Sequence, residues 1–245
     1  MDLEIVWESL PRLFEGSLLT VQITAISVVI GLCLAIPLAM MRLAHNPLVW
    51  MPVYGYIFYF RGTPFIAQLF LIYYGSGQFR ETLEAAGLWV FFREAYFCAV
   101  LALTLNTAAY TAEILRGAIL GVPFGEIEAA RACGMSRALL YRRIILPKAF
   151  RLALPAYSNE VVFLLQTTSI VSIIALMDLT GVARVIIARS FEPYKLFITA
   201  AIFYLVMTYG ILFVFKRVEY WLSGHLRERP EAKVEASAAD AIAVR

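Results

Sequence analysis

Polar side chains inside two long apolar stretches are the residues of this sequence that could do chemistry. Asn106 and Thr107 lie within the apolar run 95–116, and Glu160 lies within the run 154–177. Polar groups inside a membrane must pair with one another or line a water-filled path. They could therefore replace water around a polar solute, act as intramembrane acids and bases, or only hydrogen-bond helices together. The candidate solute-binding residues are Asn106, Thr107, Ser158, Glu160 and Thr167.

The spacing of these residues favours a helical face. Glu160 and Thr167 are seven residues apart, which places them on the same side of a helix. Glu113 lies near the end of its run, and we expect it to meet Arg116 or another nearby cation. The sequence shows no paired carboxylates, histidine cluster or nucleophile with a base, so nothing supports an enzyme. The two polar runs either line a cavity or bond to other helices.

The elements that must position these residues are membrane-spanning helices. The 245 residues are 61% hydrophobic with a mean hydropathy of +0.75, and the apolar residues form runs near the length that crosses a bilayer. The net charge of +3 gives no reason to expect a nucleic-acid partner. We predict an all-α integral membrane protein with five spans, at roughly 16–41, 52–74, 95–116, 154–177 and 196–215.

Two of these spans carry features of their own. The second is interrupted by Arg61-Gly62-Thr63-Pro64, because proline removes a backbone donor and glycine weakens a helix. Such a break marks either a kinked helix with Arg61 reaching the interface, or a gate. In the first span a row of small residues predicts close packing against another helix. This row consists of Ser17, Thr20, Thr24, Ser27 and Gly31.

The positive charges predict the orientation. The basic interval 117–153 should be cytoplasmic, because loops rich in Lys and Arg stay on that side. With five spans, the N-terminal segment 1–15 is then external and the tail 226–245 is cytoplasmic. The membrane-embedded body would occupy residues 16–225. The tail is rich in Ala, Glu and Lys, which predicts disorder.

The interval 117–153 contains a pattern that predicts two short helices. Pro123 suits the first position of the first helix, and Gly134 can end it in a left-handed conformation. Ser136 can cap the second helix, and Pro147 is expected to close it. The result would be a rigid knob on the cytoplasmic side.

This interval resembles the EAA signature of membrane subunits of bacterial binding-protein-dependent ABC importers. The signature is Glu-Ala-Ala, three residues, Gly, nine residues, then Ile-x-Leu-Pro, and all of its positions are present at 128–147. The segments 60–64, 103–113 and 153–160 also resemble the polar amino acid permease branch. Within that branch the chain is most similar to the M-type subunits for histidine, arginine, lysine, ornithine and opines. The likeness covers roughly residues 15–225.

The resemblance implies a five-helix, MetI-like core that works with other proteins. These are a second permease subunit, expected to be a paralogue in a heterodimer, two ATP-binding subunits and an external amino-acid-binding protein. The chain has no G-x-x-x-x-G-K-[ST] phosphate loop, so ATP and Mg would lie on the partner ATPase. The residues expected to couple to the ATPase are Glu128, Ala129, Ala130, Gly134, Leu146 and Pro147.

The transported solute is expected to be a polar, basic L-amino acid or an opine, moved into the cytoplasm across the bacterial inner membrane. A permease of the same family for uncharged or acidic amino acids is an alternative. An ion-coupled secondary transporter is another, although such folds usually carry internal repeats, and we find none here.

Overall fold

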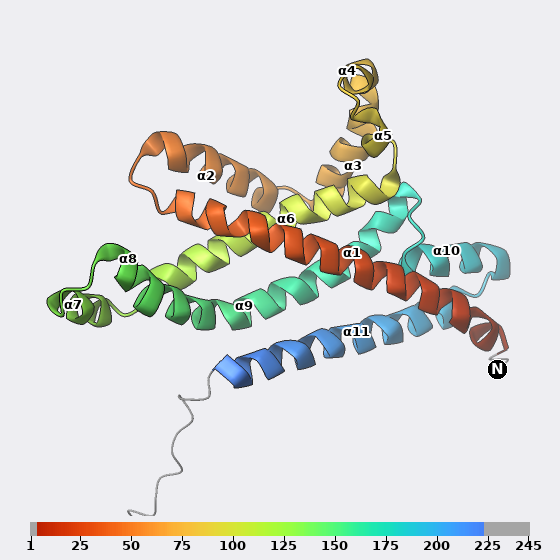
Figure 1. Ribbon diagram of the computed structural model, residues 1–245. Helices are drawn as coiled ribbons and strands as arrows, with labels where there is room; N and C mark the ends of the chain where they lie inside the picture. Colours follow the sequence, from red (N-terminus) through yellow and green to blue (C-terminus); the bar gives the residue numbers. More distant parts are fainter. Residues whose placement is uncertain (1–3, 223–245) are drawn as a thin grey trace, which may run out of the picture.

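Long helices that pack across and along one another form the body of the protein (Figure 1). The computed structural model describes residues 4–222, and this part of the chain contains no strand. The elements in chain order are α1 (Glu4–Arg42), α2 (Pro47–Gly62), α3 (Phe65–Ser76), η1 (Gly77–Phe79), α4 (Arg80–Ala85), α5 (Trp89–Phe92), α6 (Ala95–Leu120), α7 (Phe124–Ala132), α8 (Arg137–Leu140), η2 (Tyr141–Ile145), α9 (Leu146–Thr167), η3 (Thr168–Ile174), α10 (Leu179–Ser190) and α11 (Pro193–Leu222).

Three of these helices are long and apolar enough to cross a bilayer alone, namely α1, α6 and α11. A fourth candidate span runs from α8 through η3 and bends by 48° into α10. The predicted second span appears as two pieces, α2 with 16 residues and α3 with 12, each shorter than the roughly 20 residues a single span needs. Both pieces pack on α6. The helices therefore agree with the predicted all-α membrane fold.

The row of small residues in α1 packs against α6 and α10, as the sequence predicts. A Cβ atom on Gly31 would lie 2.5 Å from the Thr107 methyl group, and one on Gly16 would lie 3.0 Å from the Asp178 carbonyl oxygen. The helix starts at Glu4, twelve residues before the predicted start of the first span. Close packing of backbones brings α1 within reach of the polar residues of α6.

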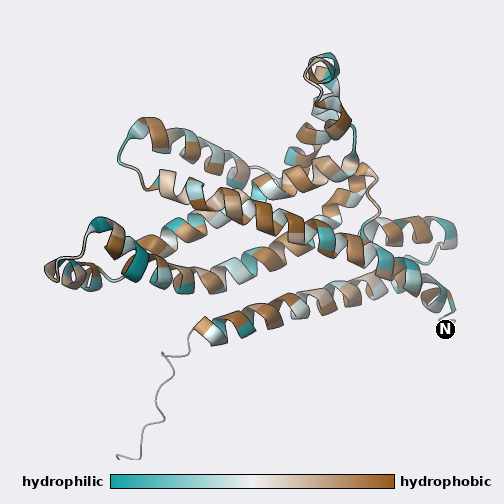
Figure 2. Cartoon of the chain, viewed as in Figure 1, coloured by the Kyte–Doolittle hydropathy of each residue, from teal (hydrophilic) through white to brown (hydrophobic). Residues whose placement is uncertain are grey.

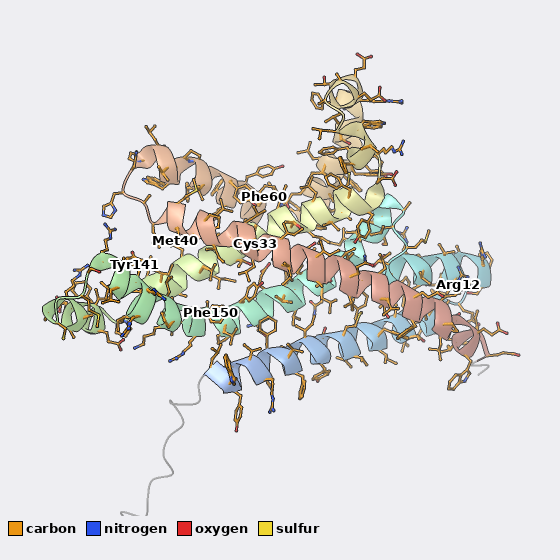
Figure 3. All side chains as sticks on the ribbon, in the orientation of Figure 1. Arg12, Cys33, Met40, Phe60, Tyr141 and Phe150 are labelled. Carbon is orange, nitrogen blue, oxygen red and sulfur yellow. The ribbon has the colours of Figure 1, made fainter. Side chains whose placement is uncertain are left out.

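The break between α2 and α3 falls at Thr63 and Pro64, as the sequence predicts. The side chain of Gln68 is buried and forms hydrogen bonds with oxygen atoms at the break. Its amide nitrogen donates to the carbonyl oxygens of Phe60 and Thr63 at 2.9 and 3.1 Å, and to the Thr63 hydroxyl at 2.8 Å. Figure 3 shows Phe60 at the end of α2 that faces α6. The carbonyl groups that the break leaves free thus find a partner inside the protein.

Asp178 caps α10 and helps to hold it against α11. Its carboxylate caps α10 by accepting from the amides of Gly181 and Thr180 at 2.9 and 3.3 Å, and from the Tyr204 hydroxyl of α11 at 3.4 Å. The next amide, that of Leu179, donates to Thr20 of α1 at 3.1 Å. The helix that follows Asp178 is thus tied to both α1 and α11.

The apolar core lies where α1, α3, α6 and α9 meet, around Ile23, Leu69, Leu103 and Leu164. Figure 2 shows that the long helices are mostly hydrophobic along their middle parts, with hydrophilic residues gathered towards their ends and in α7 to η2. The core holds α6 and α9 in a fixed relation, and these two helices carry most of the candidate site residues.

Candidate solute site and coupling hairpin

The polar interval 117–153 forms a helical hairpin at one end of the bundle (Figure 1). The first arm is α7, and it begins one residue after Pro123. The chain turns at Gly134, whose φ of +76° lies in the left-handed region that glycine adopts without strain. Ser136 then caps the second arm by accepting from the Leu139 amide at 3.4 Å. The predicted stop and the predicted cap are both confirmed.

The expectation that Pro147 closes the second helix is wrong. Pro147 lies in the first turn of α9, and the chain stays helical from Arg137 to Ile174. The turn before it is a π-helix, in which the Leu146 amide donates to the carbonyl of Tyr141, five residues earlier. This wider turn accommodates a proline that would clash with the carbonyl four residues back in a regular α-helix. The second arm of the hairpin therefore continues directly into the span that carries Glu160.

The predicted coupling residues divide between an outer and an inner face of the hairpin. Glu128, Ala129 and Gly134 are exposed, as are Leu146 and Pro147 at the start of α9. Ala130 is only 6% exposed and packs with Leu140 and Ile145 inside the hairpin. Small size at 129 thus permits approach from outside, whereas small size at 130 permits the two arms to close on each other.

An ion pair and an apolar seam hold the hairpin together. Lys148 at the start of α9 pairs with Glu126 of α7. Figure 3 shows Tyr141 and Phe150 on either side of this junction between the hairpin and the span. These contacts link α7 to the start of α9 across the hairpin.

Glu160 and Thr107 form a buried polar pair between α9 and α6. The Thr107 hydroxyl donates to the Glu160 carboxylate at 3.0 Å, and the two residues are 1% and 7% exposed. A carboxylate in such a place needs partners, because an isolated charge in a low-dielectric setting is costly. Thr107 supplies one hydrogen bond. The second carboxylate oxygen remains able to accept from an ammonium or guanidinium group.

Asn106 faces a different neighbour. Its amide nitrogen donates to the Gln68 side-chain oxygen at 2.9 Å and to the Phe60 carbonyl at 3.4 Å. Asn106 thus joins α6 to the break between α2 and α3, which realises the helix-bonding alternative for this residue. The structure does not bring it together with the carboxylate of Glu160 through any hydrogen bond.

The two remaining candidates are buried on α9. Ser158 and Thr167 are 8% and 7% exposed, and the Thr167 hydroxyl donates to the Phe163 carbonyl at 2.8 Å within its own helix. The exposed polar side chains of α9 are Asn159 and Gln166, also seven residues apart. Buried polar groups therefore lie on two sides of α9, with Glu160 and Thr167 on one and Ser158 on the other, and Asn159 and Gln166 point outward between them.

Sequence reasoning missed Gln68. Its signal was a long amide side chain four residues after a helix-breaking Pro64, within an otherwise apolar run. Glu113 meets Arg116 at 2.9 Å, as expected, and also lies 3.6 Å from Arg42. Arg61 is exposed, with its guanidinium 5.3 Å from the centre of the Tyr110 ring. Within residues 4–222 no three metal-ligating side chains come together.

Residues 27–228 match the family described as the binding-protein-dependent transport system inner membrane component. The chain is 47% identical over 229 residues to the nopaline transport system permease protein of Agrobacterium fabrum, covering 94% of this chain and 95% of that one. It is 45% identical over 210 residues to the histidine/lysine/arginine/ornithine transport system permease protein of Escherichia coli K12, covering 85% and 88%.

Solved structures show the same fold. A chain from the crystal structure of an amino acid ABC transporter with histidines superposes with a TM-score of 0.80 at 32% identity, covering 89% of this chain and 98% of that one. A chain of a methionine ABC transporter in an inward facing conformation superposes with a TM-score of 0.67 at 21% identity, covering 91% and 99%. The second likeness concerns the fold alone.

Proposed function

Because this chain belongs to the family of inner membrane components of binding-protein-dependent transport systems, we propose that it is the permease subunit of an importer for basic amino acids or opines. The observation that carries the proposal is the complete motif at 128–147, folded as an exposed hairpin that continues into the helix bearing Glu160. The relatives named for nopaline and for histidine, lysine, arginine and ornithine support this choice of solute. All of these solutes carry positive and negative groups together.

The hairpin receives force from an ATP-binding subunit. Glu128, Ala129 and Gly134 offer that partner an exposed surface of α7, and Ala130 keeps α7 close to α8 and η2. Movement of α7 would be carried through the continuous helix from Arg137 to Ile174. ATP and Mg act on the partner, and this subunit converts the closure of the ATPase into a shift of α9 against its neighbours.

The solute path runs beside α9. Glu160 neutralises a cationic group of the solute, and Thr107 holds the carboxylate in place from α6. Thr167 adds a hydroxyl group on the side of α9 that carries Glu160, and Ser158 adds one on another buried side of the helix. Asn106 keeps the break after α2 in shape. Binding of charge inside the membrane requires such replacements for lost water.

The assembly contains this chain, a paralogous second permease subunit, two ATP-binding subunits and an external binding protein. The hairpin end of the bundle faces the cytoplasm, and the N-terminal end of α1 faces outward. This orientation follows from the cations of the hairpin and of the end of α11. The exposed Asn159 and Gln166 of α9 meet the second permease subunit or the solute path, because lipid offers them no partner.

The deciding experiment is reconstitution of the complex with its binding protein in liposomes, followed by ATP-driven uptake of labelled arginine, histidine and nopaline. Omission of the ATP-binding subunit should abolish uptake, and uptake that persists without it would refute the importer. Glu160→Gln removes the charge and keeps the shape. It should reduce uptake of arginine by about tenfold or more, as expected for one charge-assisted hydrogen bond. Equal uptake by both forms would refute the role of Glu160.

The same assay separates the alternatives. A permease of this family for uncharged or acidic amino acids would accumulate glutamine or glutamate in place of arginine. An ion-coupled transporter would respond to an imposed proton or sodium gradient and not to ATP. Purification from the native host identifies the companion chains and shows whether the second permease subunit is a paralogue.

A further inference from the structure

A polar pocket lies between the C-terminal end of α1, the helix α2 and the second half of α6. Its volume is about 470 Å³, and its lining includes the three arginines Arg42, Arg61 and Arg116. Among residues 4–222, Glu113 is the one acidic residue of this lining. The pocket therefore carries an excess of positive charge, and none of the candidate solute-binding residues described above lines it.

Glu113 is already engaged by one of the three arginines. Arg116 donates to both carboxylate oxygens, from Nε at 3.1 and 3.0 Å and from Nη2 at 2.9 Å. The Nε atom of Arg42 lies 3.6 Å from the same carboxylate, which is beyond hydrogen-bond distance. Glu113 thus neutralises Arg116 and leaves the donors of the other two arginines unused.

Aromatic rings hold the other two arginines in place. The guanidinium carbon of Arg42 lies 4.6 Å from the centre of the Tyr54 ring, and that of Arg61 lies 5.3 Å from the centre of the Tyr110 ring. Within residues 4–222 neither guanidinium forms a hydrogen bond, and the Nε atom of Arg42 is buried without a partner. Contact with a ring fixes a guanidinium and keeps its N–H groups available for a planar anion.

The pocket begins one helical turn from the pair formed by Glu160 and Thr107. Tyr110 follows Thr107 by three residues on α6, about 4.5 Å along the helix, and its hydroxyl donates to the Arg61 carbonyl at 3.5 Å. Glu113 follows Thr107 by six residues, or about 9 Å. The charge of Arg61 also interacts with that of Glu160. A site for a cation and a site for an anion are therefore neighbours.

We propose that the pocket binds the carboxylate of the transported solute through Arg42 and Arg61, a role that rests on the proposed function of the chain. Glu160 then binds the cationic end of the same molecule. Six covalent bonds join the guanidinium carbon of arginine to its carboxylate carbon, roughly 7 Å when extended. This length falls within the range of about 5–9 Å that separates the pocket residues of α6 from Thr107. The planar fork of a guanidinium also matches a carboxylate.

The test compares arginine with agmatine, its decarboxylated form, in equilibrium binding to the purified complex without nucleotide or binding protein. The wild type should prefer arginine. Arg42→Gln and Arg61→Gln should each lower this preference about tenfold, as expected for one charge-assisted hydrogen bond. Arg61→Lys should keep part of it, because lysine retains the charge without the fork. An unchanged preference in both glutamine variants would overturn the proposal.

Arg80→Gln is the matched control. Arg80 also lies against a ring, 5.4 Å from the centre of Trp89, and pairs with Glu84, but it does not line the pocket. Its replacement should leave the preference for arginine over agmatine unchanged. A tenfold loss in this variant would overturn the proposal, because the effect would then not belong to the pocket.

A second measurement uses only the wild-type complex, in case the variants do not assemble. Phenylglyoxal modifies guanidinium groups, and mass spectrometry of peptides reports its extent at each arginine. In phosphatidylcholine nanodiscs, lysine should protect Arg42 and Arg61, and cadaverine, which lacks the carboxylate, should not. Protection by phosphatidylglycerol and not by lysine would overturn the proposal by assigning the pocket to a lipid phosphate. Absence of protection would overturn it too, while ATP-driven uptake in the same complex would leave the importer standing.

Discussion

Gly31→Ala should destabilise the protein through one atom pair, and a second change should reverse the effect. The new Cβ atom would lie 2.5 Å from the Thr107 methyl carbon, while its next neighbours, the Thr104 carbonyl oxygen and the Ala108 nitrogen, lie at ordinary distances of 3.5 and 3.6 Å. Thr107 cannot turn its methyl away freely, because it is β-branched and its hydroxyl is bonded to Glu160.

The magnitude follows from two opposing contributions. Overpacking of this kind costs about 1–3 kcal/mol, and the higher helix propensity of alanine returns about 0.5–1 kcal/mol. Taking the middle of each range, a cost of about 2 kcal/mol less a gain of about 0.75 kcal/mol, we expect a net loss of about 1 kcal/mol. Gly55→Ala on α2 measures the propensity gain alone, because a Cβ atom there meets nothing within 4 Å. The two glycine variants should therefore shift stability in opposite directions.

Thr107→Ser completes the cycle, since it removes the methyl group that clashes and keeps the hydroxyl that binds Glu160. The double variant should be about 1–2 kcal/mol more stable than the sum of the single changes predicts. Thermal unfolding of the purified complex in detergent gives the order of the four proteins. A neutral Gly31→Ala, or a double variant no better than the sum, would refute the close packing of α1 on α6.

Three further substitutions test the turn of the hairpin, the break between α2 and α3, and the cap of α10. Gly134→Ala should lower ATP hydrolysis stimulated by the binding protein by about 5- to 30-fold, because a left-handed alanine costs about 1–2 kcal/mol. Gly125→Ala in the same hairpin is the control, with free space and no such strain, and equal activity of the two would contradict the role of the turn. Gln68→Leu should lower thermal stability by about 1–3 kcal/mol by leaving the carbonyl groups of the break unpaired, and an unchanged melting temperature would argue against it. Asp178→Ala should cost about 0.5–2 kcal/mol and Asp178→Asn less, because asparagine can still cap α10; equal losses would count against the cap.

The sequence was most informative where local chemistry decides the structure. Gly134, Ser136 and Pro64 each act on the backbone next to them, so the turn, the cap and the break could be predicted from the sequence alone. The prediction that Pro147 ends a helix was wrong, because the effect of this proline depends on the π turn that precedes it. That turn involves the register of a long helix, and no single residue signals it.

For the polar residues of the spans, too, the sequence predicted what local spacing determines and did not predict what helix packing determines. Helical spacing correctly grouped Glu160 with Thr167 on the buried side of α9. It could not tell that Asn106 turns towards Gln68 while its neighbour Thr107 turns towards Glu160, since adjacent residues on a helix point about 100° apart. Which helix lies in each direction is a property of the packed bundle.

The continuous helix from Arg137 to Ile174 connects the hairpin to Glu160, and it also sets the angle about the helix axis at which the Glu160 side chain points. The hairpin and Glu160 are held at a set rotation to each other, and each α-helical residue between Leu146 and Glu160 contributes about 100° to that angle. Substitutions along α9 leave the angle intact, but adding or removing one residue would swing the carboxylate away from Thr107 and towards another neighbour. The number of residues between Leu146 and Glu160 thus decides which neighbour the carboxylate meets, whatever side chains occupy the positions between them.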